Sequence, residues 1–383
     1  MSQEIAIGII AGIRRRKRSV ERVVSGLDFS TNDYLGLRNE PRVRAAAIAG
    51  IEEFGVGSGG AREVAAGTTL IRELERRIVL FKGTRGAWMV QSGYVANMGV
   101  VPVLVGPGDF VFLDRQNHQS TKDGALLSGA SVVIYPHADV DALDRELKKS
   151  ASSAPSKTLI VTDGVFGLTG DIAPLPEIVE AAERHGATVM VDDAHGSGVL
   201  GRGRGTVAHF GLTERVAVQV GTASKAMGVL GGYVTVMSEE VLERFADARP
   251  MTHSTALPAH LAAACLAALD IIEAEPQRID RLWAIRERFA AGLVAAGLDI
   301  GCSQTPILPI AVGTPETTIE LGRRLRSRGV LASVHVPPKV QPEQSRLRFT
   351  VTTDHTAANI DLAVSLIAEA ARDLGIRLHR TGD

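Results

Sequence analysis

A single lysine, Lys225, stands where it could act as a nucleophilic amine. It follows a short β-branched run over 216–220, which predicts a buried strand, and lies on a turn rich in glycine and hydroxyl residues. A lysine that is removed from water is partly deprotonated and can form a Schiff base with an aldehyde. The alternative is a lysine that reaches solvent from an ordinary loop, and Lys225 alone does not decide between the two.

A second predicted strand, over 187–191, ends in Asp192, and His195 follows three residues later. An aspartate at this point would keep the pyridinium nitrogen of pyridoxal phosphate protonated, so that the ring can accept electrons, and the histidine would hydrogen-bond near the phenolic oxygen. Taken separately, Asp192 could cap a helix and His195 could be a structural histidine. Because Lys225 ends another strand further along, the combination indicates a pyridoxal phosphate site.

A third feature is the predicted turn over residues 92–94, between a strand at 87–91 and a helix that extends to about residue 104. Free N–H groups and the helix dipole favour an anion, so we expect the cofactor phosphate at this turn. His118 follows a predicted strand at 110–113. It could stack on the cofactor ring and shuttle protons, or it could simply cap a helix.

Polar residues near the two ends of the chain could hold a substrate. Asn32 lies in a segment otherwise suited to burial, where it could contact a substrate or form an Asx-turn. Arg346 and Arg348 alternate along a predicted strand and share one face, which could bind a carboxylate or lie in solvent. Residues 1 to about 28 have the pattern of an amphipathic helix with a basic end at 14–18, which is either solvated or contacts the phosphates of a nucleotide-tailed substrate.

Strands and helices alternate through the middle of the chain, which predicts an α/β fold with a mostly parallel central sheet covered by helices on both faces. Ligands of such sheets bind at the carboxyl ends of the strands, and His118, Asp163, Asp192 and Lys225 fall at or just beyond such ends. The predicted strands are 87–91, 110–113, 132–135, 159–162, 187–191, 216–220 and 233–237, and the predicted helices are 70–81, 92–104, 140–149 and 176–185.

We expect three regions along the chain. These are an N-terminal helix and arm over 1–38, a large cofactor-binding α/β domain over 39–275, and a small C-terminal α+β domain over 276–383. In the last region the pattern predicts strands at 307–312, 331–336 and 346–352, and helices at 317–328 and from about 357.

The composition argues against several other functions. The 42 Lys and Arg residues nearly balance the 43 Asp and Glu residues, so no overall field favours nucleic acid or a membrane. Cys265 and Cys302 lack metal-ligand spacing, so we expect no metal and a reducing compartment. The apolar run 5–13 is too short to span a bilayer, and we expect a soluble cytoplasmic protein.

A set of ordered motifs resembles the α-oxoamine synthase family of fold-type-I pyridoxal phosphate enzymes. The resemblance extends from about residue 28 to the C-terminus and implies the fold of that family, with a smaller C-terminal domain. The motifs are at 30–36, 55–60, 92–97, 162–166, 191–196, 222–225 and 346–348.

The resemblance implies a role for each matching residue. Lys225 would carry the cofactor and act as the base, Asp192 would pair with the ring nitrogen, and His118 would stack on the ring. The implied catalytic residues are Lys225, His118, Asp192 and His195. The implied cofactor-binding residues also include Gly93, Tyr94, Asp163, Thr222 and Ser224, together with Ser254 and Thr255 from the other subunit of a homodimer. The implied substrate-binding residues are Asn32, Arg348, Arg14 and Lys339.

The resemblance also implies a reaction, the condensation of an amino acid with an acyl thioester to give an α-amino ketone, carbon dioxide and a free thiol. The best pair is L-alanine with pimeloyl-CoA or a pimeloyl carrier protein, as in biotin synthesis. Glycine or serine with a different acyl-CoA, as in quorum-signal, sphingoid-base or specialised-metabolite synthesis, is the alternative within the family. An aminotransferase on the same fold is a more remote alternative.

The chain departs from the family pattern at a few positions. Gly167 stands where the family usually has a serine that touches the cofactor, and residues 168–169 replace a usual Met-Asp pair. Ile71 stands where a histidine is expected, and Lys339 stands where a threonine near the substrate is expected. These departures concern the exact reaction, through the cofactor contact at Gly167 and through the choice of substrate.

Overall fold

A seven-stranded sheet forms the centre of the molecule in a computed structural model that describes residues 26–376 except 63, 66 and 154. The strand order is β2-β8-β7-β6-β5-β3-β4, and only β8 runs in the direction opposite to the other six strands. This confirms the predicted mostly parallel sheet. The strands are β2 Gly86–Val90, β3 Phe110–Asp114, β4 Ser131–Tyr135, β5 Thr158–Asp163, β6 Thr188–Asp192, β7 Val218–Thr222 and β8 Gly232–Val236.

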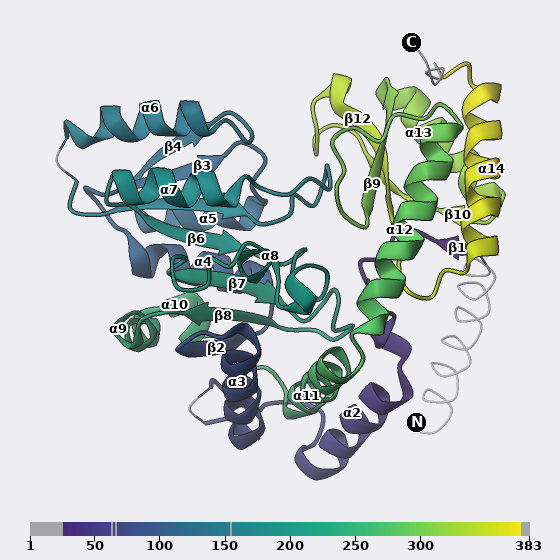
Figure 1. The fold of residues 1–383 in the computed structure, drawn as a ribbon. Coiled ribbons are helices and arrows are strands. Elements are labelled where there is room, and N and C mark those ends of the chain that lie inside the picture. Colours follow the sequence, from purple (N-terminus) through teal and green to yellow (C-terminus); the bar gives the residue numbers. More distant parts are fainter. Residues whose placement is uncertain (1–25, 63, 66, 154, 377–383) are drawn as a thin grey trace, which may run out of the picture.

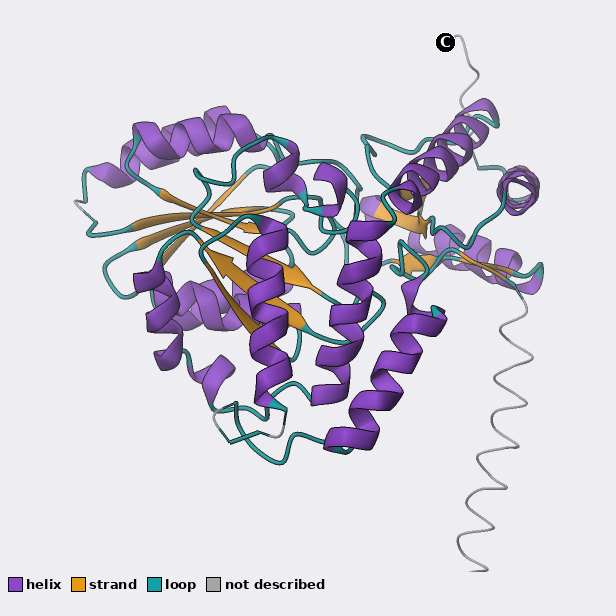
Figure 2. Ribbon diagram, turned by 60° about the horizontal axis from the view of Figure 1, so that its bottom comes forward, coloured by secondary structure: helices purple, strands orange, loops and turns teal. Residues whose placement is uncertain are grey.

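Helices cover both faces of this sheet, as Figure 2 shows. Successive side chains of a strand point to opposite faces, so Val111 and Leu113 pack into one core while Phe112 packs into another. The first core includes α4 and the second includes α7. The helices around the sheet are α3 Thr68–Lys82, α4 Gly93–Leu104, α5 Gln119–Ser128, α6 Val140–Ala151, α7 Leu175–Arg184, α8 Thr206–His209, α9 Glu239–Glu243 and α10 Arg249–Thr252.

A smaller antiparallel sheet of order β11-β12-β9 lies beside the seven-stranded sheet (Figure 1). Its strands are β9 Ile307–Gly313, β11 Ser333–His335 and β12 Ser345–Thr350, and α12 Gln277–Ala295, α13 Pro315–Ser327 and α14 Ala357–Asp373 pack around it. The predicted strand 331–336 is in fact two strands, β10 Val330–Leu331 and β11. We propose the division at residue 276 as a domain boundary, since these elements all follow it.

The helix predicted over residues 1 to about 28 does not extend to its expected end. Leu27 and Asp28 form strand β1, parallel to β10, and do not continue a helix. Arg14 and the rest of the basic segment lie outside the described residues. Several helices have no counterpart among the predicted elements, including α2 Pro41–Phe54, α5 and α12, and α2 packs along α11 Ala259–Ala274. The short 3₁₀ helices are η1 Leu37–Asn39, η2 Gly201–Gly203, η3 Arg244–Asp247 and η4 Pro342–Gln344.

A buried ion pair joins the end of α3 to the residue that follows β6. Lys82 Nζ is 2.9 Å from Asp193 Oδ2, and both side chains are almost completely buried. Lys82 Nζ also donates to the carbonyl of Arg204 at 2.6 Å, and the backbone N–H of Thr206 donates to Asp193. Burial opposes the charge of Lys82, but the carboxylate of Asp193 outweighs it and raises the pKa of the lysine.

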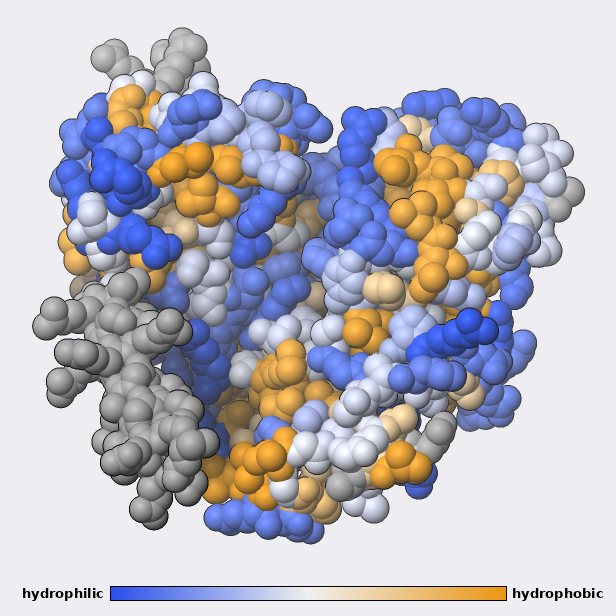
Figure 3. All heavy atoms as spheres, turned by 180° about the vertical axis from the view of Figure 1, so that it is seen from behind, coloured by the Kyte–Doolittle hydropathy of each residue, from blue (hydrophilic) through white to orange (hydrophobic). Residues whose placement is uncertain are grey.

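Hydrophobic areas are interspersed with hydrophilic ones on the face seen in Figure 3, and a hollow crosses its middle. None of the helices within the described ranges is both long and apolar enough to cross a membrane.

Candidate active site

A cavity of about 250 Å³ opens at the carboxyl ends of β5, β6 and β7. It is the place where a parallel sheet is expected to bind a ligand. Most of the residues predicted to bind a cofactor line it, although they come from distant parts of the chain. The lining residues are Ser92, Gly93, Tyr94, Asn97, His118, Ser120, Asp163, Val165, Gly167, Asp192, Ala194, His195, Thr222, Ser224 and Lys225.

Asp192 is held rigidly at the end of β6. Its Oδ2 accepts a hydrogen bond of 2.6 Å from Asn97 Nδ2, and its Oδ1 accepts one of 3.1 Å from the N–H of Ala194. Asn97 also donates to Ser120 Oγ at 2.9 Å. A carboxylate has further lone pairs, so Asp192 can still accept a hydrogen bond from a ring N–H. Sequence reasoning missed Asn97 as a site residue; the signal was an amide in the otherwise apolar helix α4.

Asp163 is buried beside Asp192 at the end of the neighbouring strand β5. Burial and the charge of Asp192 raise the pKa of Asp163 well above its usual range. Two buried carboxyl groups this close cannot easily both ionise, so the proton is favoured on Asp163. The backbone N–H of His118 donates to Asp163 Oδ1 at 3.2 Å. This hydrogen bond connects the loop after β3 to the end of β5.

Lys225 lies half-buried on the turn that follows β7. Burial, together with the charge of Arg348, lowers the pKa of its amine to about 8 although Asp192 and Asp163 oppose the shift. At neutral pH roughly a tenth of such an amine is unprotonated, which is the reactive form. The turn is closed by Thr222 Oγ1, which donates to the carbonyl of Gly231 at 2.8 Å. The strand predicted at 216–220 is β7 at Val218–Thr222, two residues further along, so Thr222 belongs to the strand.

His118 is a helix cap and also lines the pocket, while its predicted stacking on the cofactor ring stays a prediction. It is the N-cap of α5, where its Nδ1 is 2.7 Å from Ser120 Oγ and accepts from the N–H of Ser120. Its ring also lines the pocket. Desolvation lowers the pKa of His118, so its imidazole is neutral and able to stack against an aromatic ring.

The N-terminus of α4 offers free hydrogen-bond donors to the pocket. Ser92 caps the helix by accepting from the N–H of Val95, and its carbonyl accepts from the N–H of Ala96. The N–H groups of Gly93 and Tyr94 have no partner within the described part of the chain, and both residues line the pocket. Such a helix end suits a phosphate.

Arg348 connects the three-stranded sheet to the pocket. Its Nη1 donates to the carbonyl of Gly167 at 2.7 Å, and its Nη2 donates to Asn32 Oδ1 at 3.2 Å. Its Nε is buried without a hydrogen-bond partner, and burial lowers the pKa of the guanidinium. Neither Arg348 nor Asn32 lines the cavity itself, but Arg348 contacts Gly167, which does. An unpaired buried donor on a guanidinium beside the pocket suits a carboxylate ligand.

Three further predicted site residues, Ser254, Thr255 and Lys339, do not line the pocket either. The hydroxyl of Ser254 donates to the carbonyl of Pro250 at 3.0 Å, and the carbonyl of Thr255 accepts from the side chain of Gln91. Lys339 is exposed on the loop before η4. Their expected roles in binding stay predictions, as does that of Arg14.

The donor set of this pocket fits pyridoxal phosphate. It combines an amine, Lys225, with a carboxyl group, Asp192, and with unpaired N–H groups at the N-terminus of α4. These match in chemistry the aldehyde, the pyridinium and the phosphate of that cofactor.

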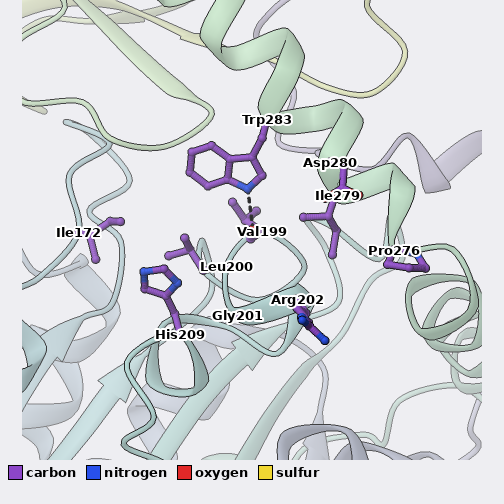
Figure 4. Close-up of a pocket in the computed structure, with 10 residues that line it drawn as sticks. All are labelled: Ile172, Val199, Leu200, Gly201, Arg202, His209, Pro276, Ile279, Asp280 and Trp283. Carbon is purple, nitrogen blue, oxygen red and sulfur yellow. Dashed lines mark hydrogen bonds between the residues drawn. The ribbon is translucent and has the colours of Figure 1, made fainter.

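A second cavity, of about 570 Å³, lies between η2 and the start of α12 (Figure 4). Its walls include Val199, Ile279 and Trp283, and the indole N–H of Trp283 donates to the carbonyl of Val199 at 3.0 Å. None of the predicted site residues lines this larger cavity.

His137 supports the wall of the pocket from outside. Its Nδ1 lies 3.0 Å from Asp114 and its Nε2 lies 2.9 Å from Asp171. Asp171 belongs to the loop that carries Gly167, because its carbonyl accepts from the N–H of Phe166. Burial favours the neutral ring, but the two carboxylates outweigh burial and raise the pKa of His137 to about 9.

This pKa predicts a pH-dependent stability. Because the folded-state pKa lies above the usual value, the stabilisation is complete below about pH 6.5 and is lost as the pH rises through 9. We expect the free energy of unfolding to fall by about 2 kcal/mol over this window, after allowance for partial exposure of the ring. Urea unfolding of the wild type and of His137→Gln at pH 6.5 and 9.5 measures it. If the free energy of unfolding fell equally in both proteins between pH 6.5 and 9.5, the raised pKa of His137 would not be its cause.

Comparison with known proteins places the chain in a family. The model for aminotransferase class I and II matches residues 24–367. The chain is 46% identical to an 8-amino-7-oxononanoate synthase of Symbiobacterium thermophilum over 363 residues, which are 94% of this chain and 92% of that protein. It is 43% identical to 8-amino-7-oxononanoate synthase 1 of Bacillus subtilis, over 91% of this chain and 88% of that protein.

Solved structures show the same relationship. Serine palmitoyltransferase from S. paucimobilis, with pyridoxal phosphate and myriocin bound, has a TM-score of 0.87 and 31% identity over 92% of this chain and 89% of that chain. The 8-amino-7-oxononanoate synthase of Francisella tularensis has a TM-score of 0.78 and 26% identity over 92% of this chain and 99% of that chain.

Proposed function

Because this chain belongs to the aminotransferase class I and II family and is a pyridoxal phosphate-dependent acyltransferase, we propose that it condenses L-alanine with a pimeloyl thioester. The products would be 8-amino-7-oxononanoate, carbon dioxide and the free thiol of coenzyme A or of a carrier protein. The observation that carries this proposal is the identity of 46% with an 8-amino-7-oxononanoate synthase over 94% of the chain.

The residues of the pocket support a role for each part of the reaction. When bound, pyridoxal phosphate supplies an electron sink for the negative charge that forms at the α-carbon of the amino acid. Asp192 would hold a proton on the ring nitrogen, and Asp163 lies beside it with a raised pKa. Lys225, with a pKa of about 8, accepts the α-proton of the amino acid.

Other residues would position the reacting groups. The N–H groups of Gly93 and Tyr94 bind the phosphate, and His118 stacks on the ring from the rim of the pocket. Arg348, with its free Nε, binds the carboxylate of the amino acid beside Asn32. A carboxylate fixed in this way leaves the α-proton exposed to Lys225, so that binding energy is used for orientation.

We propose a homodimer in which Ser254 and Thr255 of one subunit reach the phosphate of the other. Neither residue lines the pocket of its own chain. Thr255 forms an antiparallel β-bridge with Ala61. On either side of Ala61, two apolar side chains are exposed to solvent, Val56 at 76% and Val64 at 77%. A second subunit would remove these side chains from water.

One observation favours a second candidate. The serine palmitoyltransferase structure from S. paucimobilis superposes with a higher TM-score, 0.87, than the F. tularensis 8-amino-7-oxononanoate synthase, 0.78. This similarity favours a second candidate function in which the substrates are serine and a long-chain acyl thioester.

The test is a substrate matrix. Purified protein loaded with pyridoxal phosphate receives L-alanine, glycine or L-serine, each with pimeloyl-CoA or palmitoyl-CoA, and thiol release and carbon dioxide are measured. We expect kcat/KM to be highest for alanine with pimeloyl-CoA, by about tenfold to hundredfold over glycine or serine, because one methyl or hydroxyl group discriminates by that much. Fastest turnover of serine with palmitoyl-CoA would establish the second candidate. Conversion of the bound cofactor to its amine form by amino acid alone would establish an aminotransferase.

A further inference from the structure

Tyr34 makes a contact with the site that the proposed reaction does not use. It lies in the segment after β1 with only 1% of its surface exposed, and its hydroxyl is 2.7 Å from Nδ1 of His195. The two rings meet edge-on, with centroids 6.2 Å apart and planes at 73°. His195 lines the cofactor pocket.

The chemistry of this contact decides which atom gives the proton. Burial raises the pKa of Tyr34, so its phenol keeps its proton. Burial, with the charges of Lys225 and Arg348, lowers the pKa of His195 well below its usual value, so its ring carries one N–H. Within the described residues, His195 Nδ1 is the only acceptor within hydrogen-bond distance of the Tyr34 hydroxyl. If Nδ1 were the donor, the buried hydroxyl proton would have no acceptor, which is costly.

Gly167 provides the space that the His195 ring occupies. A β-carbon at residue 167 would lie 2.5 Å from Nε2 and 3.0 Å from Cδ2 of His195, closer than real contacts allow. The Gly167 backbone cannot move away freely, because its carbonyl accepts from Arg348 at 2.7 Å. A side chain here would therefore push the ring away from Tyr34.

We propose that Tyr34 is a positioning residue that holds His195 as the tautomer with its proton on Nε2, and that Gly167 leaves room for this ring orientation. Nε2 has no hydrogen-bond partner in the described part of the protein, and its N–H is a donor for an oxygen anion in the pocket. The phenolate oxygen of the cofactor is such an anion. Only this identification of the acceptor rests on the proposed function.

The tautomer can be measured directly. In full-length protein with ¹⁵N-labelled histidine, two-bond ¹⁵N–¹H correlations distinguish Nε2–H from Nδ1–H, and His195→Asn identifies the signals of His195. We expect the Nε2–H form in the wild type, with and without pyridoxal phosphate. In Tyr34→Phe we expect the Nε2–H to Nδ1–H ratio to fall by about fivefold to tenfold, the value of one hydrogen bond. Tyr135→Phe, which removes an equally buried hydroxyl outside the pocket, leaves the ratio unchanged.

A second variant tests the space at residue 167. Gly167→Ala is expected to shift the His195 signals in the same direction as Tyr34→Phe, because the methyl group displaces the ring. A wild-type His195 in the Nδ1–H form, or an unchanged ratio in both variants, would overturn the proposal, and the wild-type result does not depend on the folding of any variant. Because the readout needs no substrate, it stands whichever amino acid and thioester the enzyme uses.

Discussion

Lys225→Ala is expected to lower kcat by at least about a thousandfold, within the range for loss of a catalytic base and nucleophile. Lys225 is the only amine among the residues that line the described pocket, so no neighbour can replace it. The activity of the wild type should also rise with pH through about 8, because the neutral amine is the reactive form. Thiol release against pH, with pyridoxal phosphate in excess, measures both effects.

Lys122→Ala is the matched control for this experiment. Lys122 lies on α5, donates to the carbonyl of Arg115 at 3.0 Å, and does not line the pocket. Its removal should leave kcat within about twofold, as expected for a surface substitution. If Lys225→Ala kept more than a tenth of the wild-type kcat, the assignment of Lys225 would be wrong.

Lys82→Met is expected to destabilise the fold by about 3–5 kcal/mol, because it leaves the carboxylate of Asp193 buried without its partner. Methionine has a similar shape, so the loss comes from the charge and not from a cavity. Urea unfolding at pH 7 gives the free energy. The double variant Lys82→Met/Asp193→Asn should recover part of the loss, since it removes the unpaired charge.

A surface ion pair provides the control for Lys82. Lys149 lies 3.5 Å from Glu146 with 78% of its side chain exposed, and Lys149→Met should change stability by less than about 0.5 kcal/mol. If Lys82→Met lowered the free energy of unfolding by less than about 1 kcal/mol, the charge of Asp193 would have to be solvated by water or paired by a rearrangement.

The parts of the fold that were predicted are those with a strong local pattern. Short apolar runs predicted all seven strands of the large sheet, because most of these strands are buried on both faces, while the edge strand β4 is partly exposed. The polar residues just after those strands could be assigned to one site, because the carboxyl ends of parallel strands meet at one edge. This is why Lys225, Asp192 and His195 were brought together from sequence alone.

The parts that were missed depend on contacts between distant segments. Asn97 reaches Asp192 across 95 residues, Lys82 reaches Asp193 across 111, and Tyr34 reaches His195 across 161. No local pattern encodes such a pair, since each residue also suits a solvated or capping role. Ser254 and Thr255 could not be located in this way either, because their predicted partner is in another subunit.

The pairing of β1 with β10 has a consequence for the order in which the protein is made. Leu27 pairs with Val330, so one of the first described residues of the chain finds its place only after most of the polypeptide has left the ribosome. The seven strands of the large sheet lie between residues 86 and 236 and can assemble earlier. Asn32 and Arg348, which meet across 316 residues, are therefore expected to come together last. A nascent chain arrested before β12 would contain the strands that end at Asp163, Asp192 and Thr222 but would lack Arg348.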